Sequence, residues 1–176
     1  ILNALLVPFN NDAIRAVEPA PDATKLKLDI ALPKPGEVIN YSYLWEYEYK
    51  DGRDEGVKDR PVAVVLVTQS DDGFDQVHVV PMTTRPPTRG QQAVEVPQAV
   101  RRQLGLSGER SWVIVTEWNR FTWPGYDIRP VRGREPSISH GFLPSGLFRQ
   151  IRDALIAAAI DDLSIEISET LRRARR

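Results

Sequence analysis

Residues 61–67 constrain the fold of this chain more than any other segment, because they read PVAVVLV without one polar side chain. A continuous run of β-branched and aliphatic residues of this length is typical of a strand that is buried on both faces. The chain has 176 residues, which is enough for one domain with appended segments but too few for two ordinary domains. We therefore expect a single β domain that contains this segment as a buried strand.

Further short apolar segments surround this run. Large side chains recur at every second position from Ile39 to Tyr47, which predicts a strand carrying them on one face. Short strands are also expected at residues 76–81, 93–96, 111–117 and 137–142, and one or two helical turns at 98–104. Charged or glycine-containing loops separate them at residues 50–60 and 85–92. Short strands and frequent turns favour a small, strongly curved barrel over a flat sheet.

The ends of the chain differ from this β region. After Pro144 and Ser145, the apolar residues Leu147, Ile151 and Leu155 recur at helical spacing, which predicts an amphipathic helix over residues 145–176. Residues 1–33 are interrupted by prolines and are interpreted as an irregular N-terminal extension. The expected organisation is thus an extension at 1–33, a barrel at 34–144 and a C-terminal helix.

The composition narrows the chemistry. The chain contains no cysteine, which excludes disulfides, thiolate metal sites and a cysteine nucleophile. With two histidines, His78 and His140, we expect no metal centre and no cofactor. We find no export signal or membrane-length apolar run, so the expectation is a cytoplasmic protein that does not enter membranes. The net charge of −1 means that any contact with nucleic acid must come from local basic clusters.

Three short motifs occur in order in the β region: GEVI at residues 36–39, EGVKDRPV at 55–62 and VVPMTT at 79–84. Together they resemble the MazF/PemK family of bacterial toxins, whose motifs are G-[DE]-[VI], E-x-x-x-x-R-P-[VA] and a strand ending in P-[LIM]-T. Residues 41–45, 58–61, 111–113 and 123–127 further resemble the PemK-like growth inhibitors of that family. The resemblance covers about residues 34–144, so it leaves the extension outside.

This resemblance implies a fold and a function. The implied fold is a small SH3-like barrel of the MazF and CcdB type with a C-terminal helix, acting as a homodimer. The implied activity is metal-independent cleavage of single-stranded RNA by attack of a ribose 2′-hydroxyl, held in check by a cognate antitoxin.

Such a reaction needs stabilisation of negative charge on the phosphate, a hydrogen-bond donor and a proton acceptor. The resemblance carries the family's catalytic arginine onto Arg60, whose planar guanidinium can hold two phosphate oxygens. It carries the catalytic threonine onto Thr83, with Thr84 as the alternative in register. Glu55 matches the acidic position and could accept the proton or orient Arg60, while Glu117 and Asp127 remain weaker alternatives.

Binding of single-stranded RNA needs aromatic rings for the bases and cations for the phosphates. The candidates for this role are Thr84, Arg85, Arg89, Trp118, Arg120 and Trp123. The aromatic stripe at Tyr41, Tyr43 and Trp45 is interpreted as core or dimer interface. His78 lies five residues before Thr83, and an odd offset puts the two on opposite faces of a regular strand.

Two other functions stay open. The chain could be a non-enzymatic toxin that binds DNA gyrase, as the similarly folded CcdB toxins do through their C-terminal helix. It could also be an inactive SH3-like binding module in which residues 1–33 form an arm that contacts a partner or covers the Arg60–Thr83 groove. Cleavage of RNA that depends on Arg60 separates the first interpretation from both.

Overall fold

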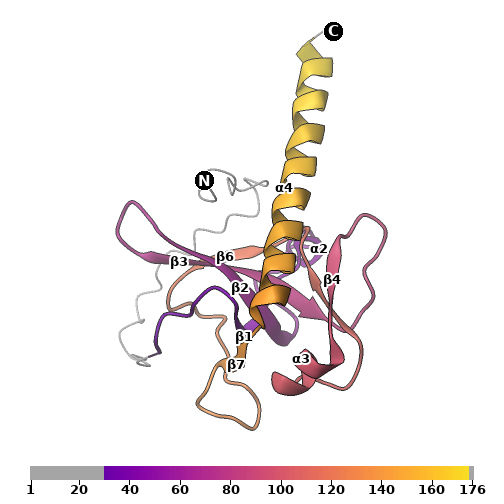
Figure 1. Cartoon of the computed structure of the whole chain (residues 1–176). Coiled ribbons are helices and arrows are strands. Elements are labelled where there is room, and N and C mark those ends of the chain that lie inside the picture. Colours follow the sequence, from indigo (N-terminus) through magenta and orange to yellow (C-terminus); the bar gives the residue numbers. More distant parts are fainter. Residues whose placement is uncertain (1–29, 175–176) are drawn as a thin grey trace.

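The computed structural model describes residues 30–174, with side chains described up to residue 162. Residues 1–29, the main part of the expected extension, lie outside the described residues. The elements in chain order are β1 (Glu37–Ser42), α2 (Glu46–Lys50), β2 (Asp59–Gln69), β3 (Asp75–Thr83), β4 (Ala93–Val96), α3 (Gln98–Gln103), β5 (Ser111–Ile114), β6 (Asn119–Thr122), β7 (Ser139–Phe142) and α4 (Ser145–Ala174). The expected mainly β fold with a C-terminal helix is confirmed (Figure 1).

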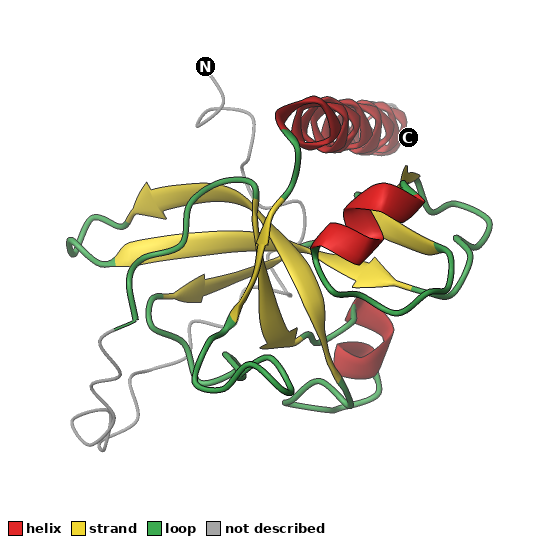
Figure 2. Ribbon diagram, turned by 60° about the horizontal axis from the view of Figure 1, so that its bottom comes forward, coloured by secondary structure: helices red, strands yellow, loops and turns green. Residues whose placement is uncertain are grey.

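The sheet is antiparallel and strongly curled. Its strand order is β4-β5-β3-β2-β1-β7, and β6 also pairs with β3. The start of β3 pairs with β6 and its end pairs with β5, so the sheet divides along this one strand. Figure 2 shows the strands curling around each other, with α4 lying across one side. This half-barrel is compatible with a small SH3-like barrel.

Strand β2 contains the apolar run at residues 61–67, as expected. Four consecutive residues, Val62 to Val65, are buried, which is the burial that the sequence predicted for an interior strand. The register with β3 shifts between Val64 and Leu66, which indicates a β-bulge. A bulge bends its strand and increases the local twist, and this helps to curl the sheet.

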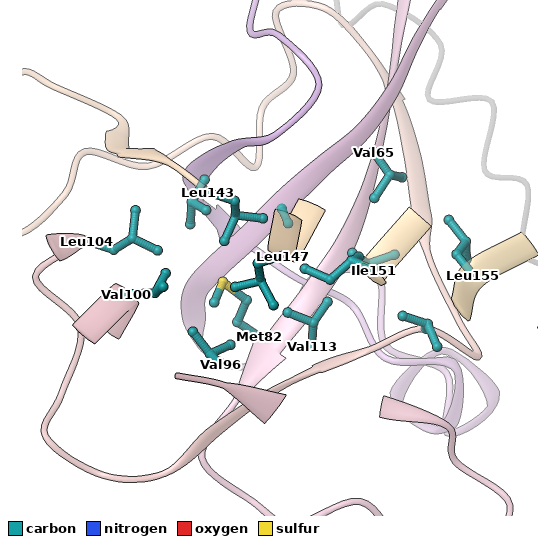
Figure 3. Close-up of a cluster of buried hydrophobic side chains, with 14 residues drawn as sticks. Val65, Met82, Val96, Val100, Leu104, Val113, Leu143, Leu147, Ile151 and Leu155 are labelled. Carbon is teal, nitrogen blue, oxygen red and sulfur yellow. The ribbon is translucent and has the colours of Figure 1, made fainter. Parts of the chain in front are cut away.

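Helix α4 covers one face of the sheet. Figure 3 shows Leu147 and Ile151 of the helix beside the strand residues Met82 and Val113, with Leu155 farther along the same buried cluster. The predicted helical spacing is thus confirmed over this part of the helix. The helix runs on without a break to Ala174, well beyond the body of the barrel (Figure 1). No helix within residues 30–174 combines the length and apolarity that crossing a bilayer requires.

The expected strand at residues 39–47 is wrong in its second half. Strand β1 ends at Ser42, Trp45 is the N-cap residue of the short helix α2, and Tyr47 lies within that helix. The reason lies in Glu48, whose carboxylate Oε2 accepts the backbone N–H of Trp45 at 3.2 Å. Such a bond, from the backbone N–H of the N-cap residue to the side chain of the third helical residue, satisfies a free donor at a helix N-terminus.

Candidate functional site

A groove of about 620 Å³ passes the ends of β2 and β3 on the side of α2. It brings together side chains from three separate segments of the chain. Its walls include Trp45, Tyr47, Glu48, Arg60, Thr83 and Arg85. Farther along, the groove is lined by Ser107, Ser111 and His140, so it extends from α2 to β7.

The sheet register places Arg60 beside Thr83. The β2–β3 pairing reaches Val62 and Pro81, so Arg60 and Thr83 each lie two residues beyond the same paired end of the two strands. Residues two positions apart on a strand share one face, so Arg60 lies on the face of Val62 and Thr83 on the face of Pro81. Because both strands belong to one antiparallel pair, the two predicted catalytic residues come from neighbouring strand ends, and both line the groove.

Arg60 is a half-buried cation without an anionic partner. Its guanidinium carbon lies 4.9 Å from the ring centroid of Trp45, in a cation–π contact. Its buried Nε makes no hydrogen bond, and no ion pair to Arg60 occurs within the described part of the chain. Burial lowers the pKa of Arg60, and the nearby Glu48 carboxylate opposes this effect. The guanidinium stays charged at neutral pH, so the groove holds an unneutralised positive charge.

Two other arginines, Arg101 and Arg110, have hydrogen-bond acceptors for their guanidinium groups. Arg110 forms a fork-like pair with Glu95, with Nη2 and Oε2 2.7 Å apart. The buried Arg101 donates to the backbone carbonyl of Glu109. Arg60 therefore differs from both in carrying its charge half-buried without such an acceptor.

Thr83 is oriented as a donor. Its Oγ1 accepts the backbone N–H of Arg85 at 3.1 Å. Because the oxygen accepts from that side, the hydroxyl hydrogen is left to donate elsewhere. Arg85 itself is exposed and lines the groove. The end of β3 thus offers a hydroxyl donor and a second cation next to Arg60.

The buried carboxylate in the groove is Glu48, which the sequence analysis did not identify; the exposed Asp59, paired at 3.8 Å with Nε of Arg129, also lines it. Glu48 is only 6% exposed, and its Oε1 lies 3.5 Å from the hydroxyl of Tyr47. Glu55, the predicted acid, is exposed on the loop between α2 and β2 and does not line the groove. A glutamate three residues after a helix start is a capping signal, but it usually follows serine or threonine rather than a residue such as Trp45.

The predicted RNA-binding residues divide into two groups. Thr84 and Arg85 line the groove, whereas Arg89, Trp118, Arg120 and Trp123 do not. Trp118 packs against the cluster under α4, and Trp123 packs against the second buried cluster. The reason is topological, because β6 pairs with the start of β3 and Thr83 lies at its other end.

Two further candidates can be placed. Glu117 does not line the groove, and its Oε2 accepts the backbone N–H of Glu46 at 3.1 Å. Burial raises the pKa of Glu117. His140 lines the far part of the groove, where its Nδ1 lies 3.2 Å from the carbonyl oxygen of Leu104. Burial lowers the pKa of His140, which favours the neutral ring.

No protein-family model matches the chain, and no curated protein matches it. The chemical interpretation therefore starts from the groove. Arg60, Arg85 and the hydroxyl of Thr83 all present hydrogen-bond donors, two of them charged, to a common space. This arrangement can hold an anion with several oxygen atoms, such as a phosphate group, with the Glu48 carboxylate close by.

Proposed function

We propose that this chain is a metal-independent endoribonuclease that cleaves single-stranded RNA in the groove between α2 and the ends of β2 and β3. The observation that carries the proposal is Arg60, a half-buried guanidinium that forms no ion pair within residues 30–162 and lines the groove together with Thr83. A buried charge is costly unless it is paired. A phosphate group of the substrate supplies the missing partner.

The reaction uses the substrate's own 2′-hydroxyl. Its oxygen attacks the adjacent phosphorus, the bond from phosphorus to the 5′-oxygen breaks, and the products are a 2′,3′-cyclic phosphate and a 5′-hydroxyl. Arg60 binds the phosphate oxygens that gain charge, and the Thr83 hydroxyl donates to one of them. Glu48, the buried carboxylate lining the groove, accepts the proton of the 2′-hydroxyl in this scheme, and the leaving 5′-oxygen takes up a proton from water.

The resemblance of residues 34–144 to the MazF/PemK toxins supports the same chemistry. On this basis the protein is a cytoplasmic toxin that works as a homodimer and is restrained by a cognate antitoxin. Arg60 and Thr83, the two positions carried over from that family, both line the groove, which supports the proposal.

The test is incubation of the purified protein with mixed single-stranded RNA in EDTA, followed by mapping of the new ends. We expect cyclic phosphate ends, and we expect Arg60→Ala to lower the rate by about a hundredfold or more, as the loss of one charge-stabilising donor does in other enzymes. The matched control is Arg110→Ala, because Arg110 is exposed and paired with Glu95 outside the groove. Circular dichroism and thermal melting show whether each variant is folded.

Unchanged cleavage by a folded Arg60→Ala variant would contradict the proposal, as would cleavage that requires a divalent metal. A supercoiling assay with DNA gyrase addresses the CcdB-like alternative. Inhibition of gyrase that persists in Arg60→Ala, with no RNA cleavage by the wild type, would replace the enzyme by a gyrase-binding toxin.

A further inference from the structure

Tyr47 is an aromatic side chain held in the groove with its ring open to solvent. It lies on α2, lines the groove and is 54% exposed. Its ring is stacked on that of Trp45, with 6.3 Å between the centroids and 23° between the planes. Its hydroxyl lies 3.5 Å from Oε1 of the buried Glu48. These two contacts restrain the ring although much of its surface is uncovered.

Tyr47 and Arg60 both contact the same side chain, that of Trp45. The ring of Tyr47 and the guanidinium of Arg60 both lie against Trp45, at 6.3 Å and 4.9 Å from its centroid. Trp45 itself is buried and offers no open face of its own. The groove therefore presents the exposed ring of Tyr47 close to the guanidinium of Arg60.

This combination matches the chemistry of a nucleotide in a single strand. Proteins bind single strands by stacking aromatic rings on the bases and by placing cations along the phosphates. A base within a duplex has both faces covered by its neighbours, so only an unstacked base can lie on Tyr47. Covering an exposed aromatic ring with a second flat, apolar face removes its surface from water and stabilises the complex.

We propose that Tyr47 stacks on a base of the RNA strand whose phosphate is bound by Arg60. This inference rests on the proposed function and adds the residue that holds the base and selects single strands over duplexes. It also moves the base-binding role from Trp118 and Trp123, which pack into the buried clusters, to α2.

The experiment measures binding apart from cleavage. The probe is a short fluorescein-labelled single-stranded RNA with 2′-O-methyl riboses, which lack the attacking hydroxyl, and binding is followed by fluorescence anisotropy. We expect Tyr47→Ala to weaken binding about 5- to 150-fold, the range that one base–aromatic stack contributes. Tyr47→Phe keeps the ring and should keep the affinity. Tyr49→Ala is the matched control, because Tyr49 is 39% exposed on the same helix but does not line the groove.

A second probe, with abasic sites in place of the bases, separates the contribution of base stacking to the affinity from that of phosphate binding. It keeps every phosphate, so wild type and Tyr47→Ala should bind it equally. An equal loss of affinity for both probes in Tyr47→Ala, or no loss for the probe with bases, would overturn the inference. The wild type alone gives an independent test, since it must bind the probe with bases more tightly than the abasic probe and more tightly than a duplex.

The outcomes also separate this inference from the proposed function. If Tyr47→Ala leaves the rate of RNA cleavage unchanged, the proposed ribonuclease activity stands and the stacking on Tyr47 is contradicted. If binding depends on Tyr47 but unmodified RNA is not cleaved, the stacking stands and the ribonuclease activity is contradicted. Absence of binding to both RNA probes by the wild type would remove both.

Discussion

Replacement of His78 by glutamine should make the stability of the fold less sensitive to acid. His78 lies on β3 with its side chain buried, and its Nε2 is 3.4 Å from Oγ1 of Thr68. Its Nδ1 is buried without a hydrogen bond. Burial, and to a lesser degree the charge of Arg120, lower the pKa of His78 from 6.5 to about 4.

The sign and size of the effect follow from this pKa. Below pH 6.5 the unfolded chain binds a proton at His78, whereas the folded chain does not bind it until the pH falls to about 4. The stability contributed by the neutral ring is therefore complete above pH 6.5 and is lost as the pH falls toward 4. With about 1.4 kcal/mol per pKa unit, the loss near pH 4 is about 3 kcal/mol.

The assay is urea unfolding at a series of pH values between neutral and about 4. Glutamine cannot take up the proton, so the free energy of unfolding of His78→Gln should fall by about 3 kcal/mol less than that of the wild type over this range. His140→Gln is measured alongside, because burial also lowers the pKa of His140. Parallel pH profiles for His78→Gln and the wild type would refute the reasoning. Since His78 does not line the groove, His78→Gln should also retain RNA cleavage.

Three other substitutions test the fold around the groove. Burial raises the pKa of Glu117, so the stability that the protonated group contributes is present at low pH and is lost as the pH rises through the raised pKa. Thermal melts at neutral pH should therefore show Glu117→Gln to be more stable than the wild type. Ile151→Ala should lower the free energy of unfolding in urea by about 2–5 kcal/mol, because this side chain of α4 is fully buried against the sheet. Ile160→Ala, at an exposed position of the same helix, should change that free energy by less than about 0.5 kcal/mol. A β-carbon at Gly56 would run into the backbone of Tyr43, so Gly56→Ala should cost about 1–3 kcal/mol in the same assay and lower RNA cleavage.

Local periodicity predicted most of the fold but not its irregular parts. The run at residues 61–67 and the spacing of Leu147, Ile151 and Leu155 report burial directly, so both were predicted correctly. Alternation of large side chains continues by chance beyond Ser42, and it concealed the turn into α2. Strand β6 reads NRFT, which is too short and polar to show a strand pattern, and pairing with β3 forms it.

The site was predictable only where a motif marks it. Arg60 and Thr83 stand at motif positions, and the antiparallel pairing of β2 and β3 brings them together. Tyr47 and Glu48 carry no motif, and their place in the groove depends on the helix α2 that the sequence pattern concealed. Residues that enter a site through an unforeseen turn cannot be found from spacing alone.

The state of Arg60 follows from the alternation of β2 itself. The adjacent acid, Asp59, alternates with Arg60 along the strand and, although it also lines the groove, its Oδ1 lies 3.8 Å from Nε of Arg129. Arg60 itself lies over Trp45, whose ring attracts the cation but does not neutralise its charge. Glu48 is near enough to influence this charge, yet it is bonded to the backbone of α2 rather than to Arg60. Glu48 and Asp59 thus line the same groove but form no ion pair with Arg60, so an anion that enters the groove can supply the neutralising contact.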